Sequence, residues 1–310
     1  MKIFNSIKSF STSKATIVTI GTFDGVHIGH NKILEQITKS AHKLNCESLV
    51  LTFFPHPRMV LQEDSEMKQL NTLDEKIALL DDLGIDNLVV HPFDKEFSRL
   101  TAEEFVKEVL VAVFKIKKII IGHDHRFGRN RTANIDDLIG FGGTYGFEVE
   151  QISAEAINEV SISSTKIRNA LIEGNIELAT TYLGYNYSIA GTVSKGKQLG
   201  RTIGFPTANI KIEEQYKLIP LNGVYIAKAN IDGNIVFGMM NIGTRPTVDG
   251  TTQTIEINLF DFNQDIYNQK ITISFLHRMR SEQKFESVDS LKMQLNIDKT
   301  AAQEYIRQLE

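Results

Sequence analysis

The sequence predicts an α/β fold in two parts, a parallel-sheet domain over residues 1–184 and a small antiparallel β-barrel with a terminal helix over residues 185–310. In the first part, strand-like and helix-like segments alternate, which is typical of a parallel sheet with helices on both faces. In the second part, short β-type segments follow one another closely, which is typical of a barrel.

Each element of the first part has a local justification. Residues 16–20 are apolar and β-branched, and apolar residues at helical spacing predict a helix over 31–44. Capping-box patterns begin helices at Thr72 and Thr101. The remaining predicted strands are 48–53, 88–91, 118–122 and 147–152, with a further helix at 135–145. Residues 176–185 are expected to close the domain.

In the second part, predicted strands cover 187–193, 224–231, 235–241, 254–260 and 271–276, and a helix covers about 288–309. The dipeptide Asp232-Gly233 between two of these strands predicts a hairpin turn. No repeat or low-complexity linker separates the two parts.

Composition limits the class of protein. The 310 residues are 42% hydrophobic and 23% charged, as in a globular protein, and the net charge of −4 disfavours bulk nucleic-acid binding. Cys46 is the only cysteine, which fits a reducing compartment. No stretch has membrane-spanning length. We therefore expect a cytoplasmic protein with no nucleic-acid or membrane partner, for which weak self-association is left open.

The turn over residues 21–30, GTFDGVHIGH, joins the first long strand to the first long helix. Its glycines let the backbone approach a phosphate group, and the helix N-terminus offers free N–H donors. His27 and His30 add further donors. A metal site or a plain tight turn is the alternative, but no third ligand accompanies the two histidines.

A second phosphate site is predicted at residues 161–168, where consecutive hydroxyls precede Lys166 and Arg168 at a helix start. Two loops follow other strands. The loop 52–58 carries two prolines and could be merely rigid. The loop 122–131 carries three arginines, which suits a phosphate or acidic substrate, with RNA binding or a His-x-His metal site as alternatives.

In the second part, residues 191–198 nearly match a phosphate-binding P-loop, but Gln198 replaces the required Ser or Thr and residues 199–206 are not expected to begin a helix. Thr207 and Asn209 offer hard oxygen ligands for Mg²⁺, although this segment could be an ordinary strand entry. Glu256, on an alternating strand, is either a solvated group or a general base for a primary hydroxyl.

These segments resemble a known family. The turn 21–30 is similar to the signature of the HxGH nucleotidyltransferases, residues 161–168 to their ISSTxIR motif, and residues 196–210 to the GRxxGFPTANI segment of riboflavin kinases. Across the chain, the sequence resembles the bacterial bifunctional riboflavin kinase/FAD synthetase family. The resemblance implies a Rossmann-like FMN adenylyltransferase domain, a riboflavin kinase-like barrel, and ATP and Mg²⁺ acting with riboflavin, FMN and FAD.

The resemblance also implies site residues. The catalytic residues would be His27, His30 and Glu256, and the metal ligands Thr207 and Asn209. The nucleotide-binding residues would be Gly21, Phe23, Asp24, Gly25, Gly29, Ser163, Ser164, Thr165, Arg168, Gly196, Lys197, Gly200 and Arg201. The flavin-binding residues would be Phe54, His56, Pro57, Arg58, Asp124, Phe127, Arg280, Glu282 and Phe285.

Two positions depart from the family pattern: His125 replaces an aromatic residue, and Asn258 stands where many relatives have His. Three rival hypotheses remain. One is a monofunctional adenylyltransferase with a non-catalytic flavin-binding barrel, another is a different HxGH transferase with an appended domain, and the third is an RNA-binding protein. Glu256 beside Thr207 and Asn209 argues for two activities.

Overall fold

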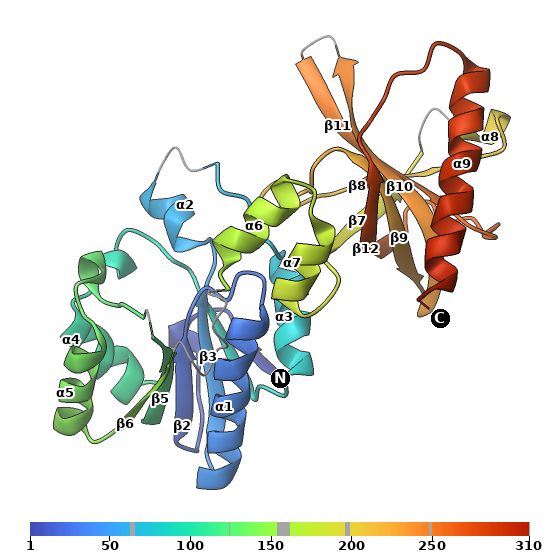
Figure 1. Ribbon diagram of the computed structural model, residues 1–310. Coiled ribbons are helices and arrows are strands. Elements are labelled where there is room, and N and C mark those ends of the chain that lie inside the picture. Colours follow the sequence, from blue (N-terminus) through green and yellow to red (C-terminus); the bar gives the residue numbers. More distant parts are fainter. Residues whose placement is uncertain (63–65, 124, 154–161, 196–198, 248–249, 310) are drawn as a thin grey trace. The chain divides into compact units, whose positions relative to one another are not determined.

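The computed structural model describes residues 1–62, 66–123, 125–153, 162–195, 199–247 and 250–309 (Figure 1). The chain divides into two compact units, Met1–Ser164 and Thr165–Glu310. We describe each unit by itself. The domain boundary that the sequence predicts lies at residue 184, after the segment 176–185, and it stays a prediction.

A parallel sheet forms the centre of the first unit, with six strands in the order β1-β4-β3-β2-β5-β6 among the described residues. The strands are β1 (Lys2–Phe4), β2 (Thr16–Ile20), β3 (Glu47–Phe53), β4 (Asn87–His91), β5 (Ile116–Gly122) and β6 (Glu148–Ile152). The predicted parallel sheet is thus confirmed. Strand β1 was not predicted, because three residues are too few for a periodic pattern.

The helices of this unit are α1 (Ile28–Leu44), α2 (Pro57–Leu61), α3 (Leu73–Asp82), α4 (Ala102–Glu104), the π-helical segment η3 (Phe105–Val111) and α5 (Ile135–Tyr145). Short 3₁₀ turns lie at η1 (Ile7–Ser9), η2 (Phe97–Arg99) and η4 (Arg129–Arg131). Both predicted capping boxes, at Thr72 and Thr101, are present. Helix α2 begins at Pro57, near the end of the loop 52–58.

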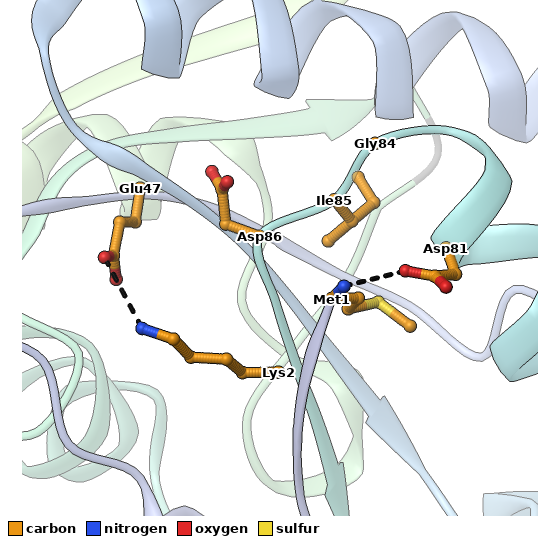
Figure 2. Close-up of a pocket in the computed structure, with 7 residues that line it drawn as sticks. All are labelled: Met1, Lys2, Glu47, Asp81, Gly84, Ile85 and Asp86. Carbon is orange, nitrogen blue, oxygen red and sulfur yellow. Dashed lines mark hydrogen bonds and ion pairs between the residues drawn. The ribbon is translucent and has the colours of Figure 1, made fainter.

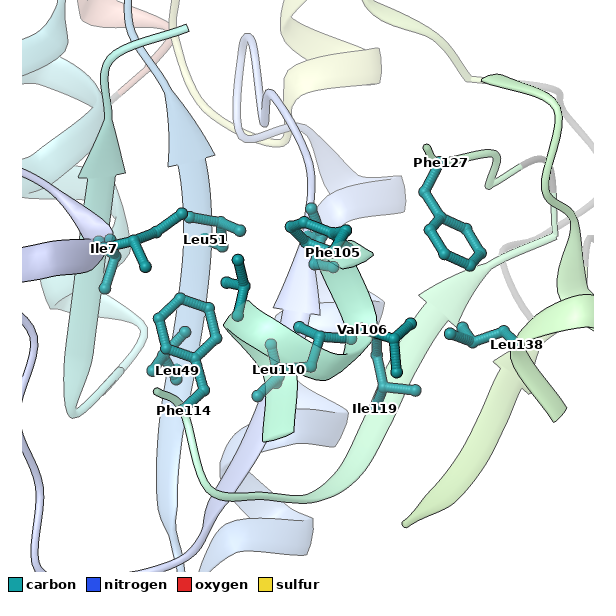
Figure 3. Close-up of a cluster of buried hydrophobic side chains, with 14 of the residues drawn as sticks. Ile7, Leu49, Leu51, Phe105, Val106, Leu110, Phe114, Ile119, Phe127 and Leu138 are labelled. Atoms are coloured by element: carbon teal, nitrogen blue, oxygen red, sulfur yellow. The ribbon is translucent and has the colours of Figure 1, made fainter. Parts of the chain in front are cut away.

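The sheet is buried on both faces because its side chains alternate between two hydrophobic clusters. Leu49 and Leu51 of β3 belong to one cluster, together with residues of η3 and α5, as Figure 3 shows for part of that cluster. Val50, between them, packs in the other cluster with residues of α1 and α3. This alternation confirms that helices cover both faces of the sheet.

The strand order determines where a ligand can bind. From β2, the chain adds β3 and β4 on one side and later β5 and β6 on the other side. The order therefore reverses between β2 and β5, and ligands in open parallel sheets bind at the carboxyl ends of strands near such a reversal. The turn after β2 and the loop that begins at His123 after β5 leave the sheet at this edge.

In the second unit, six described strands close into a barrel in the order β10-β11-β8-β7-β12-β9, and every pair is antiparallel. The strands are β7 (Ser188–Ser194), β8 (Ala208–Lys211), β9 (Gly223–Ile231), β10 (Asn234–Thr247), β11 (Gly250–Leu259) and β12 (Lys270–Arg280). Asp232 and Gly233 both have positive φ, 49° and 86°, as the predicted hairpin turn requires.

The helices of the second unit are α6, which begins at the unit boundary (Ser164–Ile172), α7 (Ile176–Leu183), α8 (Leu199–Thr202) and α9 (Val288–Arg307). The predicted antiparallel barrel with a terminal helix is confirmed. The expectation that no helix begins after residue 198 is wrong, since α8 forms one turn there. A Cβ atom on Gly200 would lie 2.1 Å from the Phe205 carbonyl oxygen, so this turn requires glycine. Within the described ranges, every helix is too short or too polar to cross a membrane.

Candidate active sites

The turn between β2 and α1 has a strained backbone. Phe23, Gly25 and Val26 have φ values of 46°, 90° and 35°, in the left-handed region that non-glycine residues rarely adopt. Each such non-glycine residue costs on the order of 1–3 kcal/mol, so surrounding contacts must impose the conformation. The Asp24 carboxylate accepts a hydrogen bond from the Leu70 backbone N–H at 2.9 Å.

The two histidines lie together at the start of α1. His27 caps the helix, and its Nδ1 accepts a hydrogen bond from the His30 N–H at 3.4 Å. The two rings stack with centroids 3.6 Å apart and an angle of 17°, and the edge of Phe23 meets the His30 ring at 5.1 Å. His30 Nδ1 is buried and has no hydrogen-bond partner among the described residues. The two imidazole rings are therefore fixed in position, and His30 Nδ1 can still form a hydrogen bond with a ligand.

Burial keeps both imidazoles neutral. It lowers the pKa of His27 to about 4, against a smaller opposing effect of Asp24. It also lowers the pKa of His30 well below its ordinary value, and the nearby His27 and Lys76 add to this shift. At pH 7 each imidazole carries one N–H, so both remain able to donate to a phosphate oxygen.

These shifts predict an acid-sensitive first unit. Folding lowers the pKa of His27 from about 6.5 in the unfolded chain to about 4. The free energy of unfolding therefore has its full value above pH 6.5 and decreases as the pH falls from 6.5 through 4, because the unfolded chain binds the proton first. For His27 the loss amounts to about 3 kcal/mol. We expect calorimetry at pH 7 and pH 4 to show a smaller loss in the His27→Asn variant than in the original chain. An equal loss in both would contradict this assignment.

The start of α6 contacts the same turn. The Ser164 hydroxyl donates to the Asp24 backbone carbonyl at 2.8 Å, which ties the second predicted phosphate segment to the first. Ser163 is partly buried and Thr165 is exposed. Arg168, on α6, belongs to the second compact unit. The Ser164 hydroxyl thus links the two predicted phosphate-binding segments.

The described flavin-binding candidates of the first unit lie at the start of α2 and in the loop after β5. His56 caps α2, and its Nδ1 accepts a hydrogen bond from the Arg58 N–H at 3.1 Å. Arg58 is exposed. Phe127 is only 8% exposed and packs in the core, with its ring nearly parallel to that of His125 at 6.1 Å. Asp124 lies outside the described residues.

In the barrel, β8, together with the residue just before it, brings the predicted metal ligands to the predicted base on β11. Asn209 pairs with Glu256 across the two strands. The Thr207 hydroxyl donates to Glu256 Oε2 at 3.4 Å. The structure therefore places three oxygen-bearing side chains beside one another, although they are up to 49 positions apart in the sequence.

Asn258 has a structural role that the sequence did not reveal. Its Nδ2 donates to the Pro206 carbonyl at 2.6 Å, and the side chain is 8% exposed. This bond fixes the residue before Thr207. A pocket of about 370 Å³ adjoins it, lined by Phe205, Phe260 and Lys299 among others. No sequence pattern singled out Lys299, since it lies on α9 and far from the other lining residues in the chain.

The other predicted barrel residues make identifiable contacts. The Arg280 guanidinium pairs with Asp298 of α9 at 2.7 Å, and Asp298 is 3% exposed. Arg280 also lies 6.0 Å from the centre of the Phe285 ring. Glu282 accepts a hydrogen bond from the Asn222 side chain at 3.4 Å. Gly200 and Arg201 form part of α8, whereas Gly196 and Lys197 lie outside the described residues.

Figure 2 shows a pocket at the opposite edge of the first unit's sheet, next to the amino ends of β1 and β3. Its lining includes Lys2 and Glu47, which form an ion pair at 4.0 Å. None of the predicted site residues lines this pocket.

Comparison with known proteins decides the family. A family model described as FAD synthetase matches residues 9–166, and one described as riboflavin kinase matches residues 183–306. The bifunctional riboflavin kinase/FMN adenylyltransferase of Haemophilus influenzae is 39% identical over 93% of both chains. The Escherichia coli K12 protein of that name is 36% identical over 98% of both chains. The chain belongs to the bifunctional riboflavin kinase/FMN adenylyltransferase family.

A crystal structure from Streptococcus pneumoniae, described as a macrolide-efflux protein, has the same fold as this chain. Its TM-score is 0.89 and its identity 31%, over 97% of this chain and 98% of that chain. Its description names efflux, whereas both family matches and the curated relatives name flavin enzymes. The two matches cover the two candidate sites separately, which favours two activities over a monofunctional transferase with a non-catalytic barrel.

Proposed function

We propose that the barrel transfers the γ-phosphoryl group of ATP to the 5′-hydroxyl of riboflavin, and that the first unit then joins AMP from a second ATP to the FMN. The products are FMN and ADP in the first reaction, and FAD and pyrophosphate in the second. The observation that carries this proposal is the presence of two distinct polar sites in one chain, one at His27 and His30 and one at Thr207, Asn209 and Glu256.

In the kinase site, Glu256 acts as the general base. Its carboxylate accepts the proton of the riboflavin 5′-hydroxyl as that oxygen attacks the γ-phosphorus, and the bond to the leaving ADP oxygen breaks. The Thr207 hydroxyl, which donates to Glu256 Oε2 at 3.4 Å, orients the carboxylate. Arg280, Glu282 and Phe285 border the flavin, and Gly196, Lys197, Gly200 and Arg201 cover the ATP phosphates.

The donor set of this site fits Mg²⁺. Thr207 and Asn209 provide neutral oxygens next to a carboxylate, and Mg²⁺ prefers oxygen ligands and keeps positions for substrate phosphates. Among the described residues, no cluster of three His, Cys, Asp or Glu side chains is placed to hold a metal. Substrate phosphates and water would supply the remaining oxygens around the ion. When bound, the ion neutralises phosphate charge.

Removing the metal tests this part of the proposal. We expect EDTA in excess over Mg²⁺ to stop FMN formation from riboflavin and ATP, and added Mg²⁺ to restore it. A Thr207→Val variant should need more Mg²⁺ for half-maximal rate, because one oxygen ligand is lost. Unchanged FMN formation in EDTA, with metal-free reagents, would contradict the assignment of Thr207 and Asn209.

In the transferase site, a phosphate oxygen of FMN attacks the α-phosphorus of ATP and pyrophosphate leaves. His27 and His30 donate their N–H groups to the phosphate oxygens, and the N-terminus of α1 adds backbone donors. No covalent enzyme intermediate is needed, because positioning and charge stabilisation suffice. In this proposal the turn residues Gly21, Phe23, Asp24, Gly25 and Gly29, with Ser163 and Ser164, also bind the nucleotide. The roles expected of Thr165 and Arg168 rest on the resemblance of residues 161–168 to the ISSTxIR motif alone.

The flavin of the second reaction contacts Phe54, His56, Pro57, Arg58, Asp124 and Phe127 in this proposal. Arg58 is exposed and cationic, which suits the FMN phosphate, whereas Phe127 is 8% exposed and offers little surface. The cytoplasmic location, the lack of nucleic-acid binding and the weak self-association considered from the sequence stay predictions.

A further inference from the structure

A buried lysine contacts the turn over residues 21–30. Neither the sequence patterns nor the proposed mechanism assigns it a role. Lys76 of α3 is 2% exposed. Its ammonium donates to the Thr22 backbone carbonyl at 2.7 Å, and it forms no ion pair within the described part of the chain. A buried cation without a paired carboxylate is rare, because a protein with an apolar side chain of similar volume at that position would lose less free energy to desolvation on folding.

Lys76 keeps its charge despite this burial. Burial lowers its pKa to about 8, partly opposed by Asp24, so the ammonium form still dominates at pH 7. The groups that face it are Asp24 on the turn and His30 on α1, and its own helix carries Asp74 and Glu75 in the first turn. Since both histidines of the turn are neutral, Lys76 is the fixed positive charge of this group.

The contact with Thr22 also bears on the geometry of the turn. Thr22 directly precedes Phe23, which has a φ of 46°, and the Phe23 ring meets the His30 ring at 5.1 Å. Fixing the Thr22 carbonyl therefore fixes the residue that supports His30. Asp24, one residue further on, is held separately by Leu70.

We propose that Lys76 is a positioning residue for adenylyl transfer, which holds the Thr22 carbonyl in the strained turn and supplies a fixed positive charge behind the ATP phosphates. This inference rests on the proposed function of the His27 and His30 site. Lys76 acts through the turn and through its field, and it does not itself contact the reacting atoms.

The test compares Lys76→Met with Lys39→Met in the full-length chain. Lys39 lies on α1 with a side chain that is 70% exposed, so the same substitution there is a matched control. We expect K76M to reduce kcat for FAD formation from FMN and ATP by about 100-fold, the effect of losing one preorganised electrostatic contact. K39M should be unchanged, and FMN formation by the barrel should be unchanged in both variants.

Two readouts separate positioning from a merely structural role. In folded K76M, NMR titration should give a higher pKa for His30, because the cation that lowers it is gone. Lys76→Arg, which retains the charge, should be more active than K76M. FAD formation within twofold of the original chain in folded K76M, or an unmoved His30 pKa, would overturn the inference.

A measurement on the original chain does not depend on how the variants fold. The ¹⁵N resonance of Lys76 Nζ should report an ammonium group at pH 7, and a neutral amine there would overturn the inference. If the original chain itself forms no FAD from FMN and ATP, the proposed function fails instead. The two failures are therefore distinguishable.

Discussion

Glu256→Gln stops FMN formation while FAD formation from supplied FMN continues. Glutamine keeps the shape of the side chain and can still contact the Thr207 hydroxyl, which lies 3.4 Å from Glu256 Oε2. It cannot take the proton of the riboflavin hydroxyl. Loss of a general base costs 10²–10⁴-fold, so we expect a fall of about 10³-fold in kcat for FMN formation. Chromatographic separation of the flavins measures both reactions on one preparation.

Glu213→Gln is the matched control for this variant. Glu213 lies in the same unit and forms an exposed ion pair with Lys211 at 3.0 Å, so its loss should leave both activities unchanged. Loss of both activities in E256Q, or of neither, would contradict the assignment of Glu256 to the kinase reaction alone.

His27→Asn produces the opposite pattern, in which FAD formation falls and FMN formation continues. Asparagine is a favoured helix cap, so it can replace the contact that His27 Nδ1 makes with the His30 N–H. It removes the imidazole N–H that would donate to the phosphates. We expect kcat for FAD formation from FMN to fall by about 10²–10³-fold, as for loss of one donor to a developing charge.

His42→Asn provides the comparison, because His42 is an exposed residue in the last turn of the same helix. H42N should retain both activities. FAD formation in H27N equal to that in H42N would remove His27 from the mechanism. A fall in FMN formation in H27N as well would show that the two sites are not separate.

Much of the fold follows from local sequence patterns. The apolar strand at residues 16–20, the helical spacing after it and the capping boxes at Thr72 and Thr101 all lie where they were predicted. These patterns work because each depends on residues only a few positions apart. The hairpin at Asp232 and Gly233 has the same local origin.

Contacts between distant residues could not be predicted in this way. Strand β8 (Ala208–Lys211) has four residues, and its pairing with Glu256 depends on the closure of the barrel. The bond from Asn258 to Pro206 joins residues 52 positions apart, and that from Lys76 to Thr22 joins residues 54 apart. The sequence motifs predicted which residues bind substrate. The residues that hold those residues in place, such as Asn258 and Lys76, could be identified only in the tertiary structure.

The central claim is that one chain performs both reactions in sequence. The most direct test incubates the purified protein with riboflavin, ATP and Mg²⁺ and resolves the flavins by chromatography over time. The account predicts that FMN appears first and FAD follows. If riboflavin is not converted and FAD forms only from supplied FMN, the barrel is not a kinase and the account of two activities is contradicted.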